Sequence, residues 1–134
     1  MNVITQEVLD SLCDEARKSP RLRKNRNFHD RLDAPAQRLL NALEPGTEVP
    51  VHRHPNTAET YFVVRGKVRV SFFDNSGKTT LSSELSPVQK NYGIHIPAGT
   101  WHSLDVLETG TVIFEVKDGP YTPISPENIL SEIR

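Results

Sequence analysis

The spacing of hydrophobic and polar positions changes along the chain near residue 36. Within residues 5–18 the apolar residues recur at helical spacing and would form one packed face. They are Val8, Leu9, Leu12, Cys13 and Ala16. Thr5 is a suitable N-cap for this segment, and Pro20 would end it. The pattern predicts a short amphipathic helix over residues 5–18, in which Cys13 serves packing rather than catalysis.

Residues 17–31 are polar and basic, and their apolar residues show no periodicity. The segment contains seven lysines and arginines, at Arg17, Lys18, Arg21, Arg23, Lys24, Arg26 and Arg31. We interpret it as an irregular arm. Its charge is compatible with recognition of a phosphate or diphosphate group, as in a nucleotide-sugar. A solvated linker is the simpler interpretation of such a charge run.

From residue 36 onward, short runs of branched and aromatic residues alternate with turn residues. Predicted strands cover residues 37–43, 48–54, 60–64, 67–73, 93–97, 102–106 and 111–116. Asp74–Gly77 has the composition of a hairpin tip. Many short strands separated by such turns are typical of an all-β sandwich or barrel. Near the end of the chain, Ser125 followed by Pro126 predicts a short helix.

The chain length of 134 residues fits one domain. We divide it into an N-terminal helix and basic arm (1–35), a β-barrel (36–120) and a C-terminal tail with a short helix (121–134). Hydrophobic residues make up 36% and charged residues 25%, values typical of a soluble globular protein.

Charge and cysteine content narrow the partners and the compartment. The net charge of −1, the acidic remainder of the chain and the lack of aromatics interleaved with the basic residues argue against a nucleic-acid partner. No segment approaches the roughly 20 apolar residues that span a bilayer, so we expect no membrane partner. The single cysteine rules out an intramolecular disulfide and fits a reducing compartment, so we expect a cytoplasmic protein.

Four side chains have the spacing of a metal site. On a strand, His52 and His54 would point to the same face. Glu59 follows the turn at Pro55 and can return on the neighbouring strand, and His102 follows a tight turn that would aim it inward. Three imidazoles and one carboxylate suit one divalent transition metal ion such as Fe, Zn, Mn or Ni. Surface polar residues in turns are the competing interpretation, and the spacing makes it the weaker one.

These residues resemble the two sequence motifs of the cupins. Gly46-x5-His52-x-His54-x4-Glu59-x6-Gly66 matches the first motif in every position and spacing. The second is matched in part by Pro97-x-Gly99-x2-His102. Its opening glycine, Gly93, lies three rather than five residues before Pro97, and Val106 replaces an expected asparagine. The resemblance implies a cupin double-stranded β-helix, a jelly-roll barrel, with the four side chains as metal ligands.

A narrower resemblance is to the WbuC family of cupin-fold metalloproteins. It is carried by residues 38–47, 52–55, 96–102 and 114–121, and by Asn27-Phe28-His29 in the basic arm. Members of that family tend to occur in gene sets for O-antigen and other surface polysaccharides. The resemblance therefore implies sugar or nucleotide-sugar metabolism without specifying a reaction.

Other residues are candidates for catalysis or substrate binding. Tyr61 shares the face of Glu59 and is a candidate proton carrier, although such a tyrosine is more often a core aromatic. His29 is a candidate acid or base over the pocket mouth, or simply an exposed loop residue. Arg38 and Arg26 are candidates for binding a carboxylate or phosphate of the substrate. For Arg38 an outward, salt-bridged position is at least as plausible.

Alternation along two predicted strands assigns further side chains to faces. His95 stands between two isoleucines, so we expect it to face outward. Glu115 and Lys117 alternate with Phe114 and Val116, so we place these two charged residues on the solvent or interface face.

The leading functional hypothesis is a metal-dependent enzyme that isomerises or epimerises a sugar or nucleotide-sugar. The metal would act as a Lewis acid, and Tyr61 or His29 would move the proton. A non-haem iron dioxygenase and a non-catalytic, metal-supported sugar-binding module are the alternatives, because the same ligands serve all three roles. We also expect a homodimer, because open sheet edges need covering.

Overall fold

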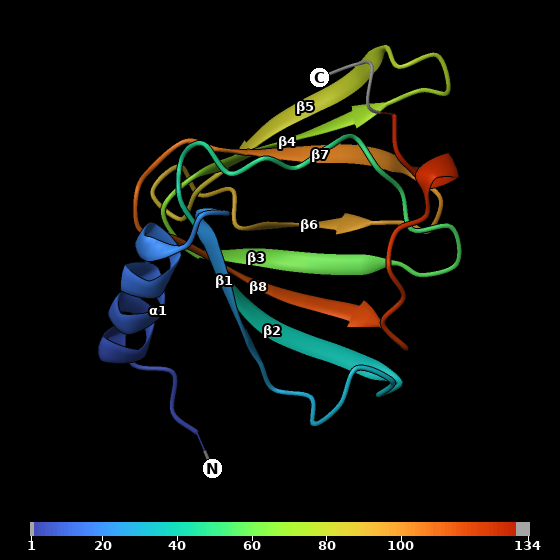
Figure 1. Ribbon diagram of the computed structural model, residues 1–134. Coiled ribbons are helices and arrows are strands. Elements are labelled where there is room, and N and C mark those ends of the chain that lie inside the picture. Colours follow the sequence, from blue (N-terminus) through green and yellow to red (C-terminus); the bar gives the residue numbers. More distant parts are fainter. Residues whose placement is uncertain (1, 131–134) are drawn as a thin grey trace.

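The computed structural model describes residues 2–130, which form one α-helix and two antiparallel β-sheets packed face to face (Figure 1). The elements are α1 (Gln6–Lys18), β1 (Arg23–Asn27), β2 (Ala36–Leu43), β3 (Glu59–Arg65), β4 (Val68–Phe73), β5 (Thr79–Leu85), β6 (Gly93–Ile96), β7 (Trp101–Val106), β8 (Thr111–Asp118) and a 3₁₀ helix, η1 (Pro126–Asn128). The all-β fold class predicted from the sequence is confirmed.

The larger sheet has the strand order β1-β2-β8-β3-β6, and the smaller one has the order β5-β4-β7. Both sheets turn apolar side chains toward the space between them, and these side chains form one core cluster. Its buried members are Leu43, Tyr61, Val63, Val68, Val70, Leu85, Ile96, Leu104, Val106 and Ile113. This core joins the two sheets and leaves room at one end of the barrel for polar side chains.

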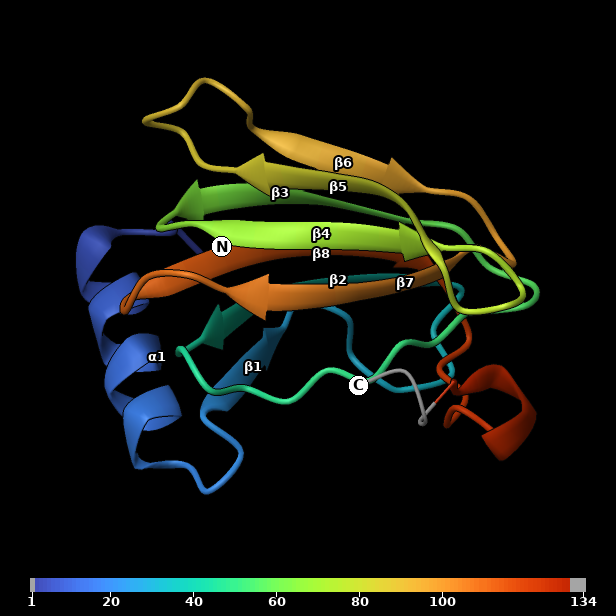
Figure 2. The ribbon, with the colours of Figure 1, turned by 90° about the horizontal axis from the view of Figure 1, so that it is seen from above.

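The N-terminal helix forms where the sequence predicts it. The Thr5 side chain accepts a hydrogen bond from the Val8 backbone N–H at 3.3 Å and caps the first turn. The predicted stripe, Leu9, Leu12, Cys13 and Ala16, is buried against β2 and β8. Figure 2 shows α1 at one end of the barrel and the 3₁₀ helix at the opposite end.

The basic arm is more regular than expected. Arg23–Asn27 forms strand β1 and pairs with β2 over its whole length, from Arg23 opposite Leu43 to Asn27 opposite Leu39. The sequence of β1 is RKNRN, which contains no apolar residue and so carries no alternation signal. Such a charged strand suits the sheet edge that it occupies, because exposed charges discourage pairing with other chains.

Two further differences concern the barrel strands. The predicted strand 48–54 is absent: the segment is irregular, with an isolated bridge from His52 to His102 and another to Ile129. Pro50 lacks the backbone N–H that a continuous ladder needs. Strand β5 was not predicted, because its first four residues are exposed and mostly polar.

The predicted hairpin turn and the predicted C-terminal helix are both present. Asp74 closes the β4–β5 hairpin, since its Oδ1 accepts from the backbone N–H groups of Ser76 and Lys78 at 2.9 Å each. Ser125 and Pro126 do begin a short helix, of the 3₁₀ type and without a side-chain cap bond. The predicted tail, 121–134, is described only as far as residue 130. No helix within residues 2–130 is long and apolar enough to cross a membrane.

Candidate metal centre

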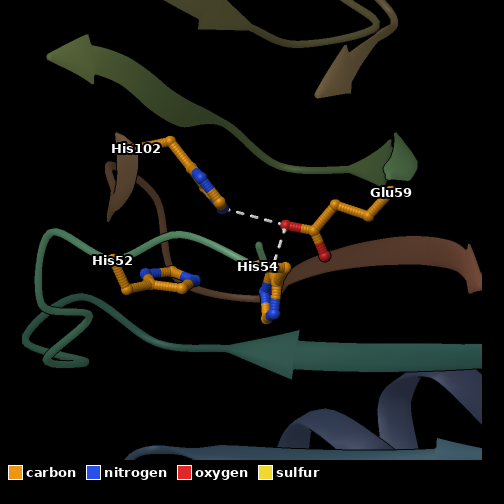
Figure 3. A group of neighbouring side chains, drawn as sticks. All are labelled: His52, His54, Glu59 and His102. Atoms are coloured by element: carbon orange, nitrogen blue, oxygen red, sulfur yellow. Dashed lines mark hydrogen bonds and ion pairs between the residues drawn. The ribbon is translucent and has the colours of Figure 1, made fainter. Parts of the chain in front are cut away.

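Four side chains converge at one end of the barrel (Figure 3). His52 and His54 come from the segment between β2 and β3, Glu59 begins β3, and His102 is the second residue of β7. One ligand atom from each lies within 4.8 Å of all the others. The larger sheet thus supplies the carboxylate, the smaller sheet supplies one histidine, and a connecting segment supplies two. The group can hold a metal ion.

The segment carrying His52 and His54 keeps strand-like alternation without being a strand. The backbones of His52 and His102 exchange two hydrogen bonds, at 3.0 and 2.9 Å. Arg53 points the other way, where its Nε donates to Asn128 Oδ1 at 2.8 Å and its guanidinium lies 4.4 Å from the centre of the Trp101 ring. Anchoring Arg53 on the outside leaves its two neighbours facing inward, as the sequence predicts.

Backbone carbonyls orient two of the imidazoles. His52 Nδ1 lies 2.8 Å from the Pro50 carbonyl oxygen, and His102 Nδ1 lies 2.8 Å from that of Thr100. A carbonyl oxygen only accepts, so each Nδ1 must carry the hydrogen and each Nε2 is left with its lone pair. Metal-ligating histidines are commonly held in this way.

The arrangement around Glu59 is stable only with a positive charge between the carboxylate and the imidazoles. Its Oε1 lies 2.9 Å from His102 Nε2 and 3.8 Å from His54 Nε2 (Figure 3). With Nδ1 of His102 already protonated, Nε2 and the carboxylate oxygen would be two acceptors facing each other. Either a second proton on the imidazole or a cation between the groups resolves this. The donor set, three imidazoles and a carboxylate, fits a divalent transition metal.

The site is already close to the protonation state that a metal requires. Burial, assisted by the charge of His102, lowers the pKa of His52 to about 4. Burial also lowers the pKa of His54, against the opposing charge of Glu59. Burial alone would raise the pKa of Glu59, but the hydrogen bond from His102 and the neighbouring positive charges outweigh it and bring that pKa to about 2. At neutral pH, His52 and His54 are neutral and Glu59 is ionised, as metal ligands must be.

The four side chains lie on the wall of a cavity of about 720 Å³. This volume is typical of a small-molecule site. Tyr61 lines the cavity beside Glu59, as expected, and only 3% of it is exposed. Burial and the charges of Glu59 and Glu115 raise the pKa of Tyr61 well above its usual range. Its hydroxyl therefore stays protonated and can donate a hydrogen bond, but it makes a poor base.

Glu115 and Lys117 lie inside the cavity, so the prediction that they face solvent is wrong. The side chain of Ile113, two residues earlier on β8, is in the core, and strand periodicity carries the next two odd positions to the same face. Phe114 faces outward, where α1 and Phe28 cover it. The residues of β8 alternate as predicted, but the apolar face is the outer one, because α1 covers it.

Glu115 is the functional candidate that the sequence did not reveal. Its Oε2 accepts a hydrogen bond from Asn41 Nδ2 at 3.2 Å. Burial, followed by the negative charge of Glu59, raises the pKa of Glu115 to about 7. The structure thus places a carboxyl group that titrates near neutrality in the same cavity as the four candidate ligands.

The remaining predicted site residues are divided between the cavity and the outside. His29 lines the cavity rim, and its Nδ1 accepts from the Arg38 backbone N–H at 3.1 Å. The Arg38 side chain is exposed and lies outside the cavity lining, because Gln37 and Leu39 occupy the inner face of β2. Arg26 also lies outside that lining: it is opposite Leu40, which packs beneath α1. The alternation along β2 gives Arg38 the outward position that the sequence already allowed. The orientation of Arg26 depends on the pairing of β1 with β2, which the polar sequence of β1 does not reveal.

His95 is exposed on β6, where its Nδ1 lies 2.8 Å from Thr60 Oγ1. The expectation that it faces outward is confirmed.

Residues 4–85 match the model of a family described as Domain of unknown function (DUF6016). The chain belongs to this family. The match covers more than half of the chain and includes α1, the basic arm and three of the four candidate ligands. No curated protein matches this DUF6016 chain.

Solved structures show what the DUF6016 chain resembles in fold. KdgF from Halomonas sp. matches with a TM-score of 0.57 and 18% identity, over 75% of this chain and 80% of its own. CapF, in complex with the inhibitor 3-isopropenyl-tropolone, matches with a TM-score of 0.61 and 21% identity, over 74% of this chain. Oxalate decarboxylase from Bacillus subtilis, studied for its Mn(II) centres, matches with a TM-score of 0.55 and 19% identity, over 75% of this chain.

The chain spans only 28% of CapF and 26% of the decarboxylase, so it corresponds to about a quarter of those proteins. At these identities the likeness shows the fold, which is the cupin jelly-roll barrel.

Proposed function

We propose that this protein is a metal-dependent cupin enzyme that isomerises or epimerises a sugar or nucleotide-sugar. One observation carries the proposal: two histidines have their Nδ1 atoms held by backbone carbonyls, and the Nε2 of one faces a buried carboxylate. His52, His54, Glu59 and His102 would hold one divalent ion, chosen among Fe, Zn, Mn and Ni. Manganese is the first to test, because the structurally similar Bacillus subtilis decarboxylase has Mn(II) centres.

When bound, the ion would draw electron density from a carbonyl or hydroxyl oxygen of the substrate. The side chains of the cavity supply the rest of the chemistry. Burial, followed by the charge of Glu59, raises the pKa of Glu115 to about 7 in the metal-free protein. Such a carboxyl group can both accept and donate a proton, which suits reversible proton transfer next to a carbonyl. Tyr61 would donate a hydrogen bond to the substrate, because it stays protonated. Glu115 is therefore a better proton carrier than Tyr61.

The nature of the cavity lining supports a carbohydrate. Amide groups of Asn25, Asn27 and Asn41 line it together with apolar side chains, a combination that suits a ring bearing hydroxyl groups. The similar CapF structure holds a small-molecule inhibitor. The WbuC-like sequence features support a place in surface-polysaccharide (O-antigen type) biosynthesis, and the single, buried and free Cys13 fits the cytoplasm.

We also propose that the protein acts as a homodimer. Phe62, Val64 and Val116 are exposed on the outer face of the larger sheet, on the part that α1 leaves uncovered. An apolar area of this kind on a sheet is a suitable contact for a second copy. Light scattering should give twice the chain mass, and the mass of a monomer at all concentrations would contradict it.

The function is tested by incubating metal-loaded protein with a panel of nucleotide-sugars and following isomer formation by NMR. We expect turnover to vanish on chelation and to fall roughly 10²–10⁴-fold in Glu115→Gln, the range for loss of a general acid or base. Asp118→Asn, an exposed carboxyl on the same strand, is the matched control and should keep full turnover.

Three outcomes would contradict the assignment as a metal-dependent isomerase or epimerase in different ways. Turnover that survives metal removal would exclude the metal from the chemistry. Oxygen uptake strictly dependent on Fe(II) would identify a dioxygenase instead. Saturable sugar binding without any product, across the panel and all four metals, would identify a binding module.

A further inference from the structure

The mouth of the cavity is positively charged although the chain as a whole carries −1. Its lining contains four lysines and arginines, which are Arg21, Arg23, Lys24 and Lys117, and two carboxylates, Glu59 and Glu115. Within residues 2–130, no ion pair joins Arg21, Arg23 or Lys24 to a carboxylate. Arg21 and Arg23 thus lie, without acidic partners, on the rim of a cavity whose far wall is the candidate metal centre.

These cations are held by an ordered turn. Leu22 has a positive φ of 58°, which is uncommon for a residue with a side chain. Its carbonyl oxygen accepts from the Glu44 backbone N–H and from Thr47 Oγ1, both at 2.9 Å, and its own N–H donates to Ser19 at 3.0 Å. The two arginines on either side of Leu22 therefore start from fixed backbone positions. A solvated linker would not be anchored in this way.

Pairing with β2 then aims the strand into the cavity. Arg23, Asn25 and Asn27 of β1 lie opposite Leu43, Asn41 and Leu39, and all six residues line the cavity. Arg26 lies opposite Leu40 and is turned toward α1. One face of β1 thus presents an arginine and two amides to the cavity. The other face carries Lys24, opposite Ala42, and Arg26 on the outside of the barrel.

At the inner end, Lys117 connects this region with the candidate metal centre. Its positive charge helps to lower the pKa of Glu59 and of His54. The cavity therefore runs from polar, metal-binding chemistry at one end to unpaired cations at the other. A ligand that satisfies both ends has an oxygen-rich head and an anionic tail.

We propose that Arg21 and Arg23 form a binding subsite for the phosphate or diphosphate group of the ligand that occupies this cavity. The inference rests on the proposed function, since it names the substrate class of the same site. Arginine forks match the oxygens of a phosphate and form charge-assisted hydrogen bonds with it. Sugar phosphates and nucleotide-sugars carry this group, whereas a neutral sugar leaves the two arginines unsatisfied.

The test measures binding of inorganic pyrophosphate to chelator-treated protein by isothermal titration calorimetry. Without metal, any affinity reports the cations and not the metal centre. The test variant is Arg21→Gln/Arg23→Gln. The matched control is Arg26→Gln/Arg38→Gln. It also removes two positive charges, one from β1 and one from β2, on the side turned away from the cavity. Circular dichroism establishes that both variants are folded.

We expect pyrophosphate to bind the wild type in a salt-dependent manner. The affinity should fall at least about tenfold in Arg21→Gln/Arg23→Gln, as for loss of a charge-assisted hydrogen bond, and stay within about twofold in the control. Absence of pyrophosphate binding to the wild type, equal losses in both variants, or equal affinity for the dicarboxylate malonate would each overturn the proposal. Metal content, measured on the same preparations before chelation, tests the metal centre separately, so the two failures are distinguishable.

Discussion

At the residue scale, the four candidate ligands are predictable because their spacing is itself the signal. His52, His54 and Glu59 fall within eight residues, and a single turn separates the histidine pair from the carboxylate. Glu115 gives no such signal. Whether it points into the barrel depends on which side of β8 is covered by α1, and this is a property of the tertiary structure rather than of the local sequence.

The position of Glu115 has a consequence for stability as a function of pH. In metal-free protein its pKa is raised to about 7 from the usual 4.5. The folded state therefore holds the proton more tightly than the unfolded state. The stabilisation that protonated Glu115 contributes is complete below the pKa that this residue has in the unfolded chain. It is lost as the pH rises through about 7.

We predict that Glu115→Gln removes this loss of folding stability at rising pH. In thermal melts of metal-free protein, the variant should gain stability relative to wild type between pH 4.5 and 7 and be more stable at pH 8 by roughly 1–3 kcal/mol. Histidine titrations, which act in the opposite direction, cancel in the comparison. If the free energies of unfolding of wild type and variant change in parallel across this pH range, the pKa of Glu115 is not raised in the folded protein.

At the element scale, the segment that carries two of the candidate ligands depends on distant parts of the chain. It is not a strand, and its backbone is fixed by β7 on one side and by the residues of the C-terminal 3₁₀ helix on the other. Asn128 contributes twice, through its carbonyl oxygen to the Arg53 N–H at 3.0 Å and through Oδ1 to Arg53 Nε at 2.8 Å. Ligand orientation should therefore be sensitive to this helix.

We predict that Asn128→Ala lowers metal affinity about tenfold, the lower end of the range for residues that orient metal ligands. The side-chain bond to Arg53 would be lost, and the segment could relax away from its present geometry. Competition with a fluorescent chelator measures the change. Asn56→Ala, at an exposed position in the turn after His54, should retain wild-type affinity. Unchanged affinity in Asn128→Ala would mean that the β7 bridge alone positions the segment.

Elements were predictable where their apolar residues alternate and not where most of their side chains are polar and exposed. β2, β3, β4, β7 and β8 each have a buried face. β1 and β5 lie at sheet edges and carry mostly exposed polar side chains, so only pairing with a neighbour makes them strands. The run 48–54 has the opposite problem: its composition suits a strand, but Pro50 and Pro55 interrupt the hydrogen-bonding pattern.

At the scale of the whole molecule, the candidate metal centre connects the two sheets. Glu59 belongs to the larger sheet and His102 to the smaller one. An ion held by both would link the sheets at the end of the barrel opposite α1, where polar side chains replace the apolar core. Sequence motifs predicted the barrel and its ligands, but the sheet order that gives the ion this linking role came from the structure.

We predict that the metal stabilises the fold. At a free metal concentration about a thousandfold above Kd, binding to the folded state contributes about 4 kcal/mol, equivalent to roughly 12–20 °C in Tm for a chain of this length. Differential scanning calorimetry with and without metal measures the shift. His95→Ala, an exposed histidine on β6, should keep the shift, and His54→Ala should lose it. A shift that persists in His54→Ala would place the binding elsewhere.

The most direct test of the account is metal content by elemental analysis of protein purified without chelators and without a histidine tag. We predict about one transition metal ion per chain, retained in His95→Ala and lost in His54→Ala. A chain that carries no metal, even after reconstitution with Fe(II), Zn(II), Mn(II) and Ni(II) in turn, would contradict the central claim. The four side chains would then be held together by protonated histidine and carboxylate alone.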